Sequence, residues 1–234
     1  MKRLIFDEDH DMFRDATRRF MQAEVEPHVE RWRANGICDK EAFLKAGEQG
    51  LLGMWVPEEY GGMGIEDFRF EQILMEETLR HGDLGLFLTL HSRLVGPYID
   101  RLGSEALKKR LLPKVVSGEC ILGIAMTEPG AGSDLAGIKS RAVRDGADWL
   151  ISGSKTYISN GINGGAFVTA ARTDPDNRHG IGLFVIEEGM EGFQRGRNLA
   201  KMGLKSQDTA ELFFDNVRVP ADNVLGNPQK GFYA

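Results

Sequence analysis

Apolar residues recur at helical spacing over the first half of the chain. A first helix is expected to begin at Asp7 or Asp9, with one face formed by Phe13, Ala16, Phe20 and Ala23. A later helix is expected to stop at Gly82, with one face formed by Phe70, Ile73, Leu74 and Glu77. Residues 84–95, LGLFLTLHSRLV, are apolar almost all round, which predicts a buried helix.

Two more helices are expected to begin at residues that favour a helix N-terminus. Asp39 is expected to cap a helix that closes at Gly50. Ser104 is expected to cap a helix over the segment SEALKKRLLPKVVSGE. Its interior Pro113 should end or kink that helix, because proline cannot donate a backbone hydrogen bond.

The hydrophobic period falls to two after Cys120. The segment AVRDGADWLISGSKTYI holds an Asp145–Gly146 turn between two strand-like runs. Further strands, rich in β-branched and aromatic residues, are expected at 166–172, 180–187 and 210–219. The sequence therefore predicts an α+β protein. Its N-terminal all-α helical domain spans residues 1–120. A mostly antiparallel, barrel-like β domain spans residues 121–234, and its last residues, NPQKGFYA, are expected to be the start of a truncated C-terminal helical domain.

Composition and charge narrow the function classes. Hydrophobic residues make up 41% and charged residues 27%, as in ordinary globular proteins. The net charge is −6 and no basic stripe suggests nucleic acid as a partner. No apolar run approaches the ~20 residues of a membrane span. The first residues turn acidic after five positions, unlike a secretory signal, so a cytoplasmic location is expected.

Cysteine and histidine spacing gives little support to metal or nucleophilic chemistry. The two cysteines, Cys38 and Cys120, form neither a disulfide framework nor a CxxC motif. The five histidines lie neither near a cysteine nor near one another at ligand spacing, so no metal site is predicted. The chain also lacks the Gly-x-Ser-x-Gly motif of hydrolases.

Residues 124–134, IAMTEPGAGSD, pass abruptly from an apolar run into a glycine-rich turn. Leu135 stands where the third glycine of a dinucleotide fingerprint belongs, and no Gly-Lys-Ser/Thr follows. Pro129 fixes one φ, while Gly130 and Gly132 can take positive φ. Successive N–H groups can then converge on an anion, with the Ser133 hydroxyl beside them. A plain turn at a strand end fits the spacing equally well.

A second segment, GSKTYISNG at 153–161, places an aromatic residue, an apolar residue, a hydroxyl and Asn-Gly in succession. Together with TEPGAGSD at 127–134, it resembles the acyl-CoA dehydrogenase family. LGMWVPEEYGGMG at 52–64 is similar to the helical domain of that family. KMGLKSQDTAELFFDNVRVPADNVLG at 201–226 is similar to the end of its β domain, most of all in the long-chain branch. The resemblance covers essentially the whole chain.

The resemblance implies an FAD site between the β domain and a C-terminal helical bundle. Thr127 would hydrogen-bond the isoalloxazine edge, and Gly132 and Ser133 would meet the flavin phosphates. The Ser159 hydroxyl would lie near the reactive N5. Tyr157 would supply a flat apolar wall where many relatives have tryptophan. The implied cofactor-binding residues are Ile124, Ala125, Met126, Thr127, Glu128, Pro129, Gly130, Ala131, Gly132, Ser133, Tyr157, Ile158 and Ser159.

The resemblance also implies the reaction: FAD-dependent α,β-dehydrogenation of a fatty acyl-CoA thioester to trans-2-enoyl-CoA, as in β-oxidation. Ser133 would meet the pantetheine arm of this substrate, and Tyr233 matches an aromatic residue beside the acyl cavity. Arg178 and His179 lie in a loop that contacts coenzyme A in long-chain relatives, although a solvated polar loop explains these two residues equally well. Electron-transfer flavoprotein is the implied electron acceptor, and the full-length family forms homotetramers or dimers.

No catalytic residue is assigned. The family's base is a glutamate in the C-terminal domain, just past the aromatic pair that Phe232 and Tyr233 resemble, and this chain ends before it. Glu211 and Asp215 fall on an expected strand and its turn, away from that motif position. We therefore expect a truncated protein that lacks the C-terminal four-helix bundle and is inactive alone.

Two other functions remain compatible with the same motifs. One is a flavin monooxygenase or a nitroalkane-type oxidase of the same fold, which the oxygen reactivity of the reduced flavin would reveal. The other is a non-catalytic module that binds flavin or CoA esters, for which tight FAD retention by the isolated chain would be the sign.

Overall fold

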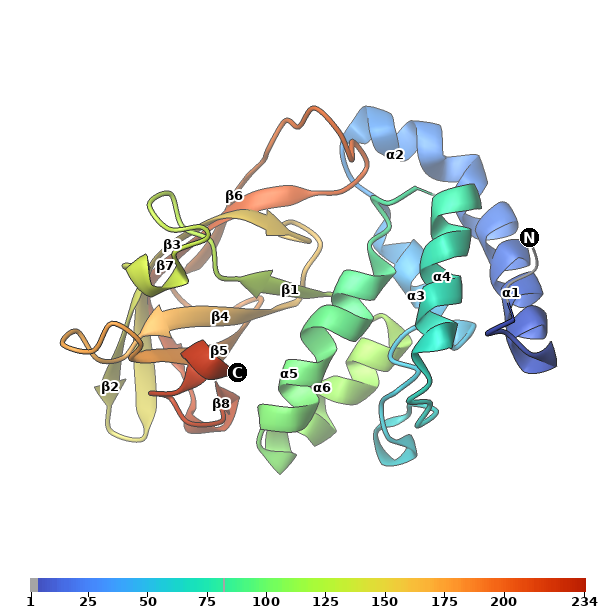
Figure 1. Cartoon of the computed structure of the whole chain (residues 1–234). Helices are drawn as coiled ribbons and strands as arrows, with labels where there is room; N and C mark the ends of the chain where they lie inside the picture. The colour runs from blue at the N-terminus through green and yellow to red at the C-terminus, as the bar shows by residue number, and fades with distance from the viewer. Residues whose placement is uncertain (1–3, 82) are drawn as a thin grey trace.

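The computed structural model describes residues 4–81 and 83–234 and places helices in one half and strands in the other (Figure 1). The predicted helix end at Gly82 lies outside the described residues. The α-helices are α1 (Glu8–Phe20), α2 (Val29–Asn35), α3 (Lys40–Glu48), α4 (Phe68–His81), α5 (Gly96–Leu102) and α6 (Glu105–Ser117). Two π-helical segments, η1 (Met21–Val25) and η4 (Leu90–Val95), extend α1 and precede α5.

The strands form one eight-stranded sheet with the order β6-β7-β3-β2-β4-β5-β8, and β1 joins β4 off this path. Most pairs are antiparallel, whereas β1 and β2 each pair with β4 in parallel. This confirms the predicted α+β class. The strands are β1 (Leu122–Ala125), β2 (Arg141–Asp145), β3 (Asp148–Ser159), β4 (Ala166–Arg172), β5 (Ile181–Glu187), β6 (Phe193–Asn198), β7 (Thr209–Val219) and β8 (Val224–Leu225).

Local signals in the sequence place several boundaries correctly. Asp7 caps α1 and accepts a hydrogen bond from the backbone of His10, so the first of the two predicted caps is confirmed. Ser104 caps α6 through the Leu107 N–H. The β2–β3 hairpin turns at Asp145–Gly146 as predicted, where Gly146 has a φ of 65°.

The predicted inner face of the first helix is partly wrong. Phe20 is buried and Phe13 is half-buried, but Ala16 and Ala23 are exposed. The π-helical turns of η1 change the phase of the helix, so Met21 and Val25 face inward instead, each with no exposed area. The face predicted for α4 is confirmed, since Ile73, Leu74 and Glu77 are all buried.

Pro113 does not end its helix, because α6 continues through it to Ser117. Neighbouring side chains of α6 pack into the core, where Leu112 and Val115 have no exposed area. This packing outweighs the missing hydrogen bond of the proline. Asp39 precedes α3 as predicted, but its carboxylate does not cap the helix and pairs with Arg31 instead.

The buried helix predicted over residues 84–95 begins later than expected. Residues 84–87 form a turn that Asp83 closes, accepting hydrogen bonds from Gly85 N at 2.8 Å and Leu86 N at 3.0 Å. Helical structure starts at Leu88 and becomes the π-helix η4, from which Leu94 is 51% exposed.

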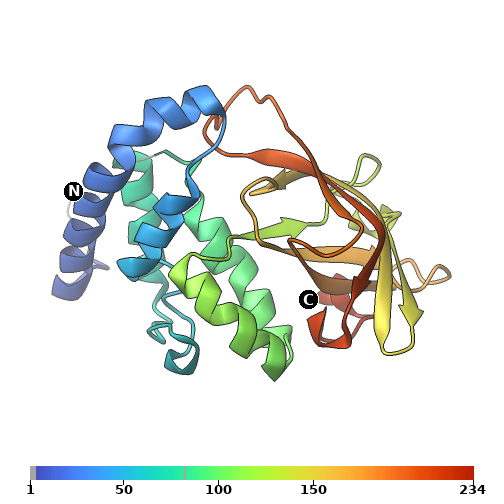
Figure 2. The same ribbon diagram turned by 180° about the vertical axis from the view of Figure 1, so that it is seen from behind.

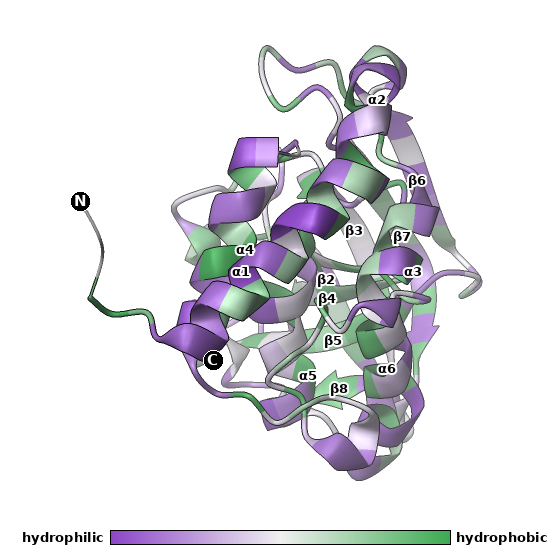
Figure 3. Cartoon of the chain, turned by 90° about the vertical axis from the view of Figure 1, so that its right-hand side faces the viewer, coloured by the Kyte–Doolittle hydropathy of each residue, from purple (hydrophilic) through white to green (hydrophobic). Residues whose placement is uncertain are grey.

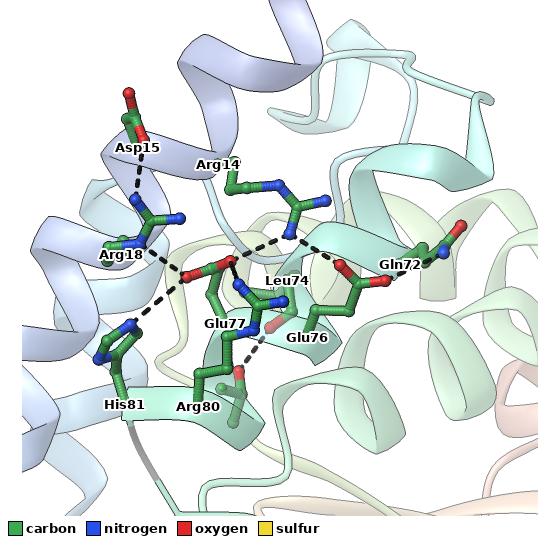
Figure 4. A network of polar contacts seen from close by, with 10 residues as sticks. Arg14, Asp15, Arg18, Gln72, Leu74, Glu76, Glu77, Arg80 and His81 are labelled. Carbon is green, nitrogen blue, oxygen red and sulfur yellow. Dashed lines mark hydrogen bonds and ion pairs between the residues drawn. The ribbon is translucent and has the colours of Figure 1, made fainter. Parts of the chain in front are cut away.

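An ion-pair network joins α1 to α4. The Glu77 carboxylate has no exposed area and accepts hydrogen bonds from Arg14 at 3.0 Å and Arg18 at 3.1 Å (Figure 4). Burial without these partners would be costly for a carboxylate, so the two arginines stabilise Glu77 within the helical half.

The two halves share one hydrophobic core. A single buried cluster includes Trp55 and Leu112 from the helical half and Leu122, Val168 and Leu183 from the strands. Figure 3 shows hydrophobic residues along β4 and β5 behind the helices. The long connection between β6 and β7 arcs over to α2 (Figures 1 and 2), where Asn198 donates a hydrogen bond to the Gly36 carbonyl at 2.7 Å.

Candidate functional site

The glycine-rich turn leaves the sheet where β1 ends at Ala125. Glu128 and Ala131 pair through two backbone hydrogen bonds of 2.9 and 3.1 Å, so the intervening Pro129 and Gly130 form the tip of a tight turn. The tip is exposed, as are the two residues that follow Ala131. The turn therefore presents its backbone to the surface.

Neither glycine of this turn has the positive φ that the sequence suggested. A Cβ built on Gly130 or Gly132 meets no atom within 4 Å. Among the described residues, the N–H groups of Gly132 and Ser133 have no hydrogen-bond acceptor. Open space over unpaired N–H groups is the property that an anion-binding turn requires.

A bulge in β3 lies beside this turn. The register of β3 against β7 shifts between Lys155 and Ile158, and Tyr157 takes a φ of 58°. That conformation is strained for a bulky residue, by about 1–3 kcal/mol. The Tyr157 side chain is 70% exposed, which places a large aromatic ring on the surface. Strain of this kind, held at an exposed ring, is typical of a functional position.

Backbone contact joins the two segments. Thr156 N, next to the bulge, donates a hydrogen bond of 2.9 Å to the Thr127 carbonyl. The hydroxyls of Thr127, Ser133 and Ser159 have no hydrogen-bond partner within residues 4–81 and 83–234. The structure thus brings the predicted Thr127 segment and the predicted Tyr157 segment together.

Some predicted site residues point inward instead. Ala125, Glu128, Ala131 and Ile158 are buried, with exposed fractions of 7% or less. Their side chains pack within the protein and support the turn and the bulge from inside. The half-buried members of the first segment are Ile124, Met126 and Thr127.

Lys155 was missed as a site residue. The residue is 1% exposed, and Nζ lies 2.8 Å from Glu128 Oε1. Burial alone would raise the pKa of Glu128, but hydrogen bonds from Lys155, Ser140 and Lys139 lower it below its ordinary value. Burial lowers the pKa of Lys155, against the opposing effect of Glu128. The signal was available: the alternation of β3 puts Lys155 on the inward side with Ile151, where a lysine needs a carboxylate.

The predicted substrate residues gather near the same turn. Arg178 donates two hydrogen bonds, of 2.9 and 2.8 Å, to the carboxylate of Asp134, which directly follows Ser133. His179 stacks on Phe232 with ring centroids 4.4 Å apart, and the Tyr233 hydroxyl lies 3.0 Å from His179 Nδ1. The loop at 173–180 and the aromatic pair at 232–233 thus form one cluster at the surface, exposed at Arg178 and Tyr233 and half-buried at His179 and Phe232.

Both carboxylates of the turn segment are already engaged, Glu128 with Lys155 and Asp134 with Arg178. In the part of the chain that the structure describes, no group of three or more His, Cys, Asp or Glu residues is placed to hold a metal ion. Within the same residues, no helix combines the length and apolar character needed to cross a bilayer.

Comparison with known protein families finds matches in both halves of the chain. The family model of the acyl-CoA dehydrogenase N-terminal domain matches residues 7–119, and the family model of the acyl-CoA dehydrogenase middle domain matches residues 123–217. The chain belongs to the acyl-CoA dehydrogenase family. Both the open turn and the Tyr157 bulge lie within the region that the middle-domain model covers.

Acyl-CoA dehydrogenases of known sequence and structure resemble the chain over nearly its full length. It is 47% identical to the mitochondrial long-chain specific acyl-CoA dehydrogenase of Sus scrofa, a match that covers 99% of the chain and 54% of that protein. The acyl-CoA dehydrogenase of Geobacillus kaustophilus is 47% identical with a TM-score of 0.95, covering 99% of this chain and 62% of that one.

A third relative was solved with a reduced flavin. The glutaryl-CoA dehydrogenase of Mycobacterium smegmatis in complex with FADH2 is 32% identical with a TM-score of 0.88, covering 97% of this chain and 57% of that one. The chain thus spans little more than half the length of these family members. The homologues support an oxidoreductase.

Proposed function

We propose that the chain forms the FAD- and thioester-binding part of an acyl-CoA dehydrogenase, which converts fatty acyl-CoA to trans-2-enoyl-CoA. One observation carries the proposal: the open turn at Gly130–Ser133 lies next to the strained, exposed Tyr157. Family membership supports it, since a relative was solved with FADH2.

The turn fits the phosphates of FAD. The space over Gly130 and Gly132 is free of other atoms, and the N–H groups of Gly132 and Ser133 lack acceptors among the described residues. Such N–H groups favour an anion, and the Ser133 hydroxyl adds a third donor. These residues would hold the pyrophosphate.

The neighbouring residues fit the flavin ring. Tyr157 offers an exposed aromatic face, and Thr127 and Ser159 offer hydroxyls that have no partner within residues 4–81 and 83–234. When bound, FAD supplies the acceptor for the hydride that leaves the substrate β-carbon. Donors held at the ring edge favour negative charge there, which is the contribution we assign to Thr127 and Ser159.

The exposed cluster beside the turn suits the coenzyme A part of a thioester. Arg178 supplies a cation for a phosphate, while His179 and Tyr233 supply donors and aromatic surface. We assign Ser133 to the pantetheine arm. The acyl chain length is left open by these contacts, although the long-chain relative supports a fatty acyl group.

We further propose that α-proton removal uses a carboxylate other than those of the turn, because Glu128 and Asp134 are both paired. We propose in addition that the chain alone supplies no base for this step, so that it binds FAD and thioester without turnover. We propose that the boundary between the helical domain and the β domain lies near residues 120–121. We also propose a cytoplasmic location, electron-transfer flavoprotein as the electron acceptor and a homo-oligomeric assembly.

Titration with FAD, followed by anaerobic addition of palmitoyl-CoA or octanoyl-CoA, tests this function. We expect saturable FAD binding and a shift of the flavin band by thioester without bleaching, with a full-length family member as the positive control. Absence of FAD binding would contradict the proposed function. Steady bleaching at enzyme-like rates would show that a base lies within residues 1–234 and overturn the proposed inactivity. Rapid reoxidation of reduced flavin by oxygen would favour an oxidase or monooxygenase.

A further inference from the structure

An ion pair is buried directly beneath the glycine-rich turn. Lys155 and Glu128 are 1% and 7% exposed, and their charged atoms lie 2.8 Å apart. Lys155 belongs to β3, two residues before the strained Tyr157. Glu128 belongs to the turn, two residues before Gly130. The pair therefore connects the two segments that form the proposed flavin site.

The pair holds more than its own two residues. Lys155 Nζ also donates a hydrogen bond to the Met126 carbonyl at 3.1 Å. The Glu128 carboxylate accepts hydrogen bonds from Lys139 N at 2.6 Å and Ser140 N at 3.0 Å, which lie on the far side of the turn. The pair thus holds backbone atoms on both sides of residues 129–138: the Met126 carbonyl before this segment, and the N–H groups of Lys139 and Ser140 after it.

Stability alone does not explain such a pair. Two buried charges lose their hydration, and well-packed apolar residues in their place are often as stable or more so. What the charges add is direction. Lys155 of β3 holds the Met126 carbonyl and the Glu128 carboxylate, and that carboxylate in turn holds the N–H groups of the two residues just before β2. The strained φ of Tyr157 likewise persists only if the surrounding structure fixes it.

We propose that the Lys155–Glu128 pair is the positioning element of the flavin site: it holds the 128–133 turn and the Tyr157 bulge in the relative placement that FAD requires. The inference rests on the proposed FAD site. Neither residue touches the ligand. Both act through the unpaired N–H groups of Gly132 and Ser133 and through the ring of Tyr157.

The test removes the pair without leaving a buried charge. Lys155→Met alone strands Glu128 and risks misfolding, so the main variant is Lys155→Met/Glu128→Gln, in which the glutamine still accepts a backbone hydrogen bond. The matched control is Arg14→Met/Glu77→Gln, which removes an ion pair of the helical half (Figure 4). Thermal unfolding of both variants measures the general loss of stability.

Two readouts then separate positioning from stability. The first is the FAD dissociation constant of the chain, and the second is hydrogen–deuterium exchange of residues 126–140 without FAD. We expect the Lys155→Met/Glu128→Gln chain to bind FAD at least tenfold more weakly and to exchange faster in the turn, with β4 unchanged. The control should retain wild-type affinity and exchange there.

The outcomes distinguish this inference from the proposed function. A folded Lys155→Met/Glu128→Gln chain with wild-type FAD affinity and wild-type exchange would overturn the positioning role alone. Equal loss of affinity in the control would also overturn it, because the effect would then follow global stability. A wild-type chain that binds no FAD would overturn the proposed function, and the inference with it.

Discussion

Replacing Gly132 by valine tests the cradle without disturbing the fold. A Cβ at this position meets no atom of the chain within 4 Å, and the backbone has no positive φ that a side chain would oppose. The residue is also exposed. We therefore expect the free energy of unfolding to change by less than about 0.5 kcal/mol, as for other surface substitutions.

The same side chain fills the space that a bound pyrophosphate would need. Its branched carbons stand over the N–H groups of Gly132 and Ser133, so the phosphate oxygens cannot reach them. We expect the FAD dissociation constant to rise at least tenfold, which is about 1.4 kcal/mol of binding free energy.

Flavin fluorescence titration measures this constant, and thermal unfolding checks the fold. Gly203→Val is the matched control, because Gly203 is likewise exposed, has no positive φ and has open space at its Cβ, but lies in the β6–β7 connection. Wild-type FAD affinity in a folded Gly132→Val chain would refute the cradle assignment.

Three further predictions concern charge. Arg178→Ala should weaken acyl-CoA binding several-fold, most at low salt. The free energy of unfolding should change by less than about 1 kcal/mol, because the ion pair of Arg178 with Asp134 is exposed. An unchanged thioester dissociation constant would contradict the substrate role. Burial lowers the pKa of His91 from 6.5 to about 4, so the unfolded chain takes up the proton first and stability falls between pH 6.5 and 4, by up to about 3 kcal/mol. In urea unfolding, the stability of His91→Gln should no longer fall between pH 6.5 and 4. An equally steep fall in the variant would show that His91 is not its cause. Burial raises the pKa of Glu71 from 4.5 to about 7, so stability falls as pH rises through that range. Glu71→Gln should therefore be more stable than wild type at pH 8 but not at pH 4. Equal stability of the two proteins at pH 8 would rule this out.

Much of the fold follows from local signals in the sequence. The period of 3.6 before Cys120 and of two after it separates helices from strands, and caps such as Asp7 and Ser104 mark helix starts. The failures come from longer-range packing. Pro113 stays inside α6 because the residues around it are buried, and π-helical turns rotate the inward face after Phe20. Neither effect is visible in a short window of sequence.

The site was predictable in part. The motif at 124–133 and the segment around Tyr157 were both singled out, and the structure brings them together through the Thr156–Thr127 hydrogen bond. The positive φ suggested for Gly130 and Gly132 is wrong. The positive φ at this site belongs to Tyr157 instead. The partner of Lys155 could not be predicted, because Glu128 is 27 residues away in sequence and approaches it only when the sheet forms.

A crystal structure of the chain with FAD tests the central claim most directly. We expect the pyrophosphate at the N–H groups of Gly132 and Ser133, the flavin ring against Tyr157, and the Thr127 and Ser159 hydroxyls at the ring edge. FAD bound elsewhere on the chain, with the 128–133 turn free, would contradict it.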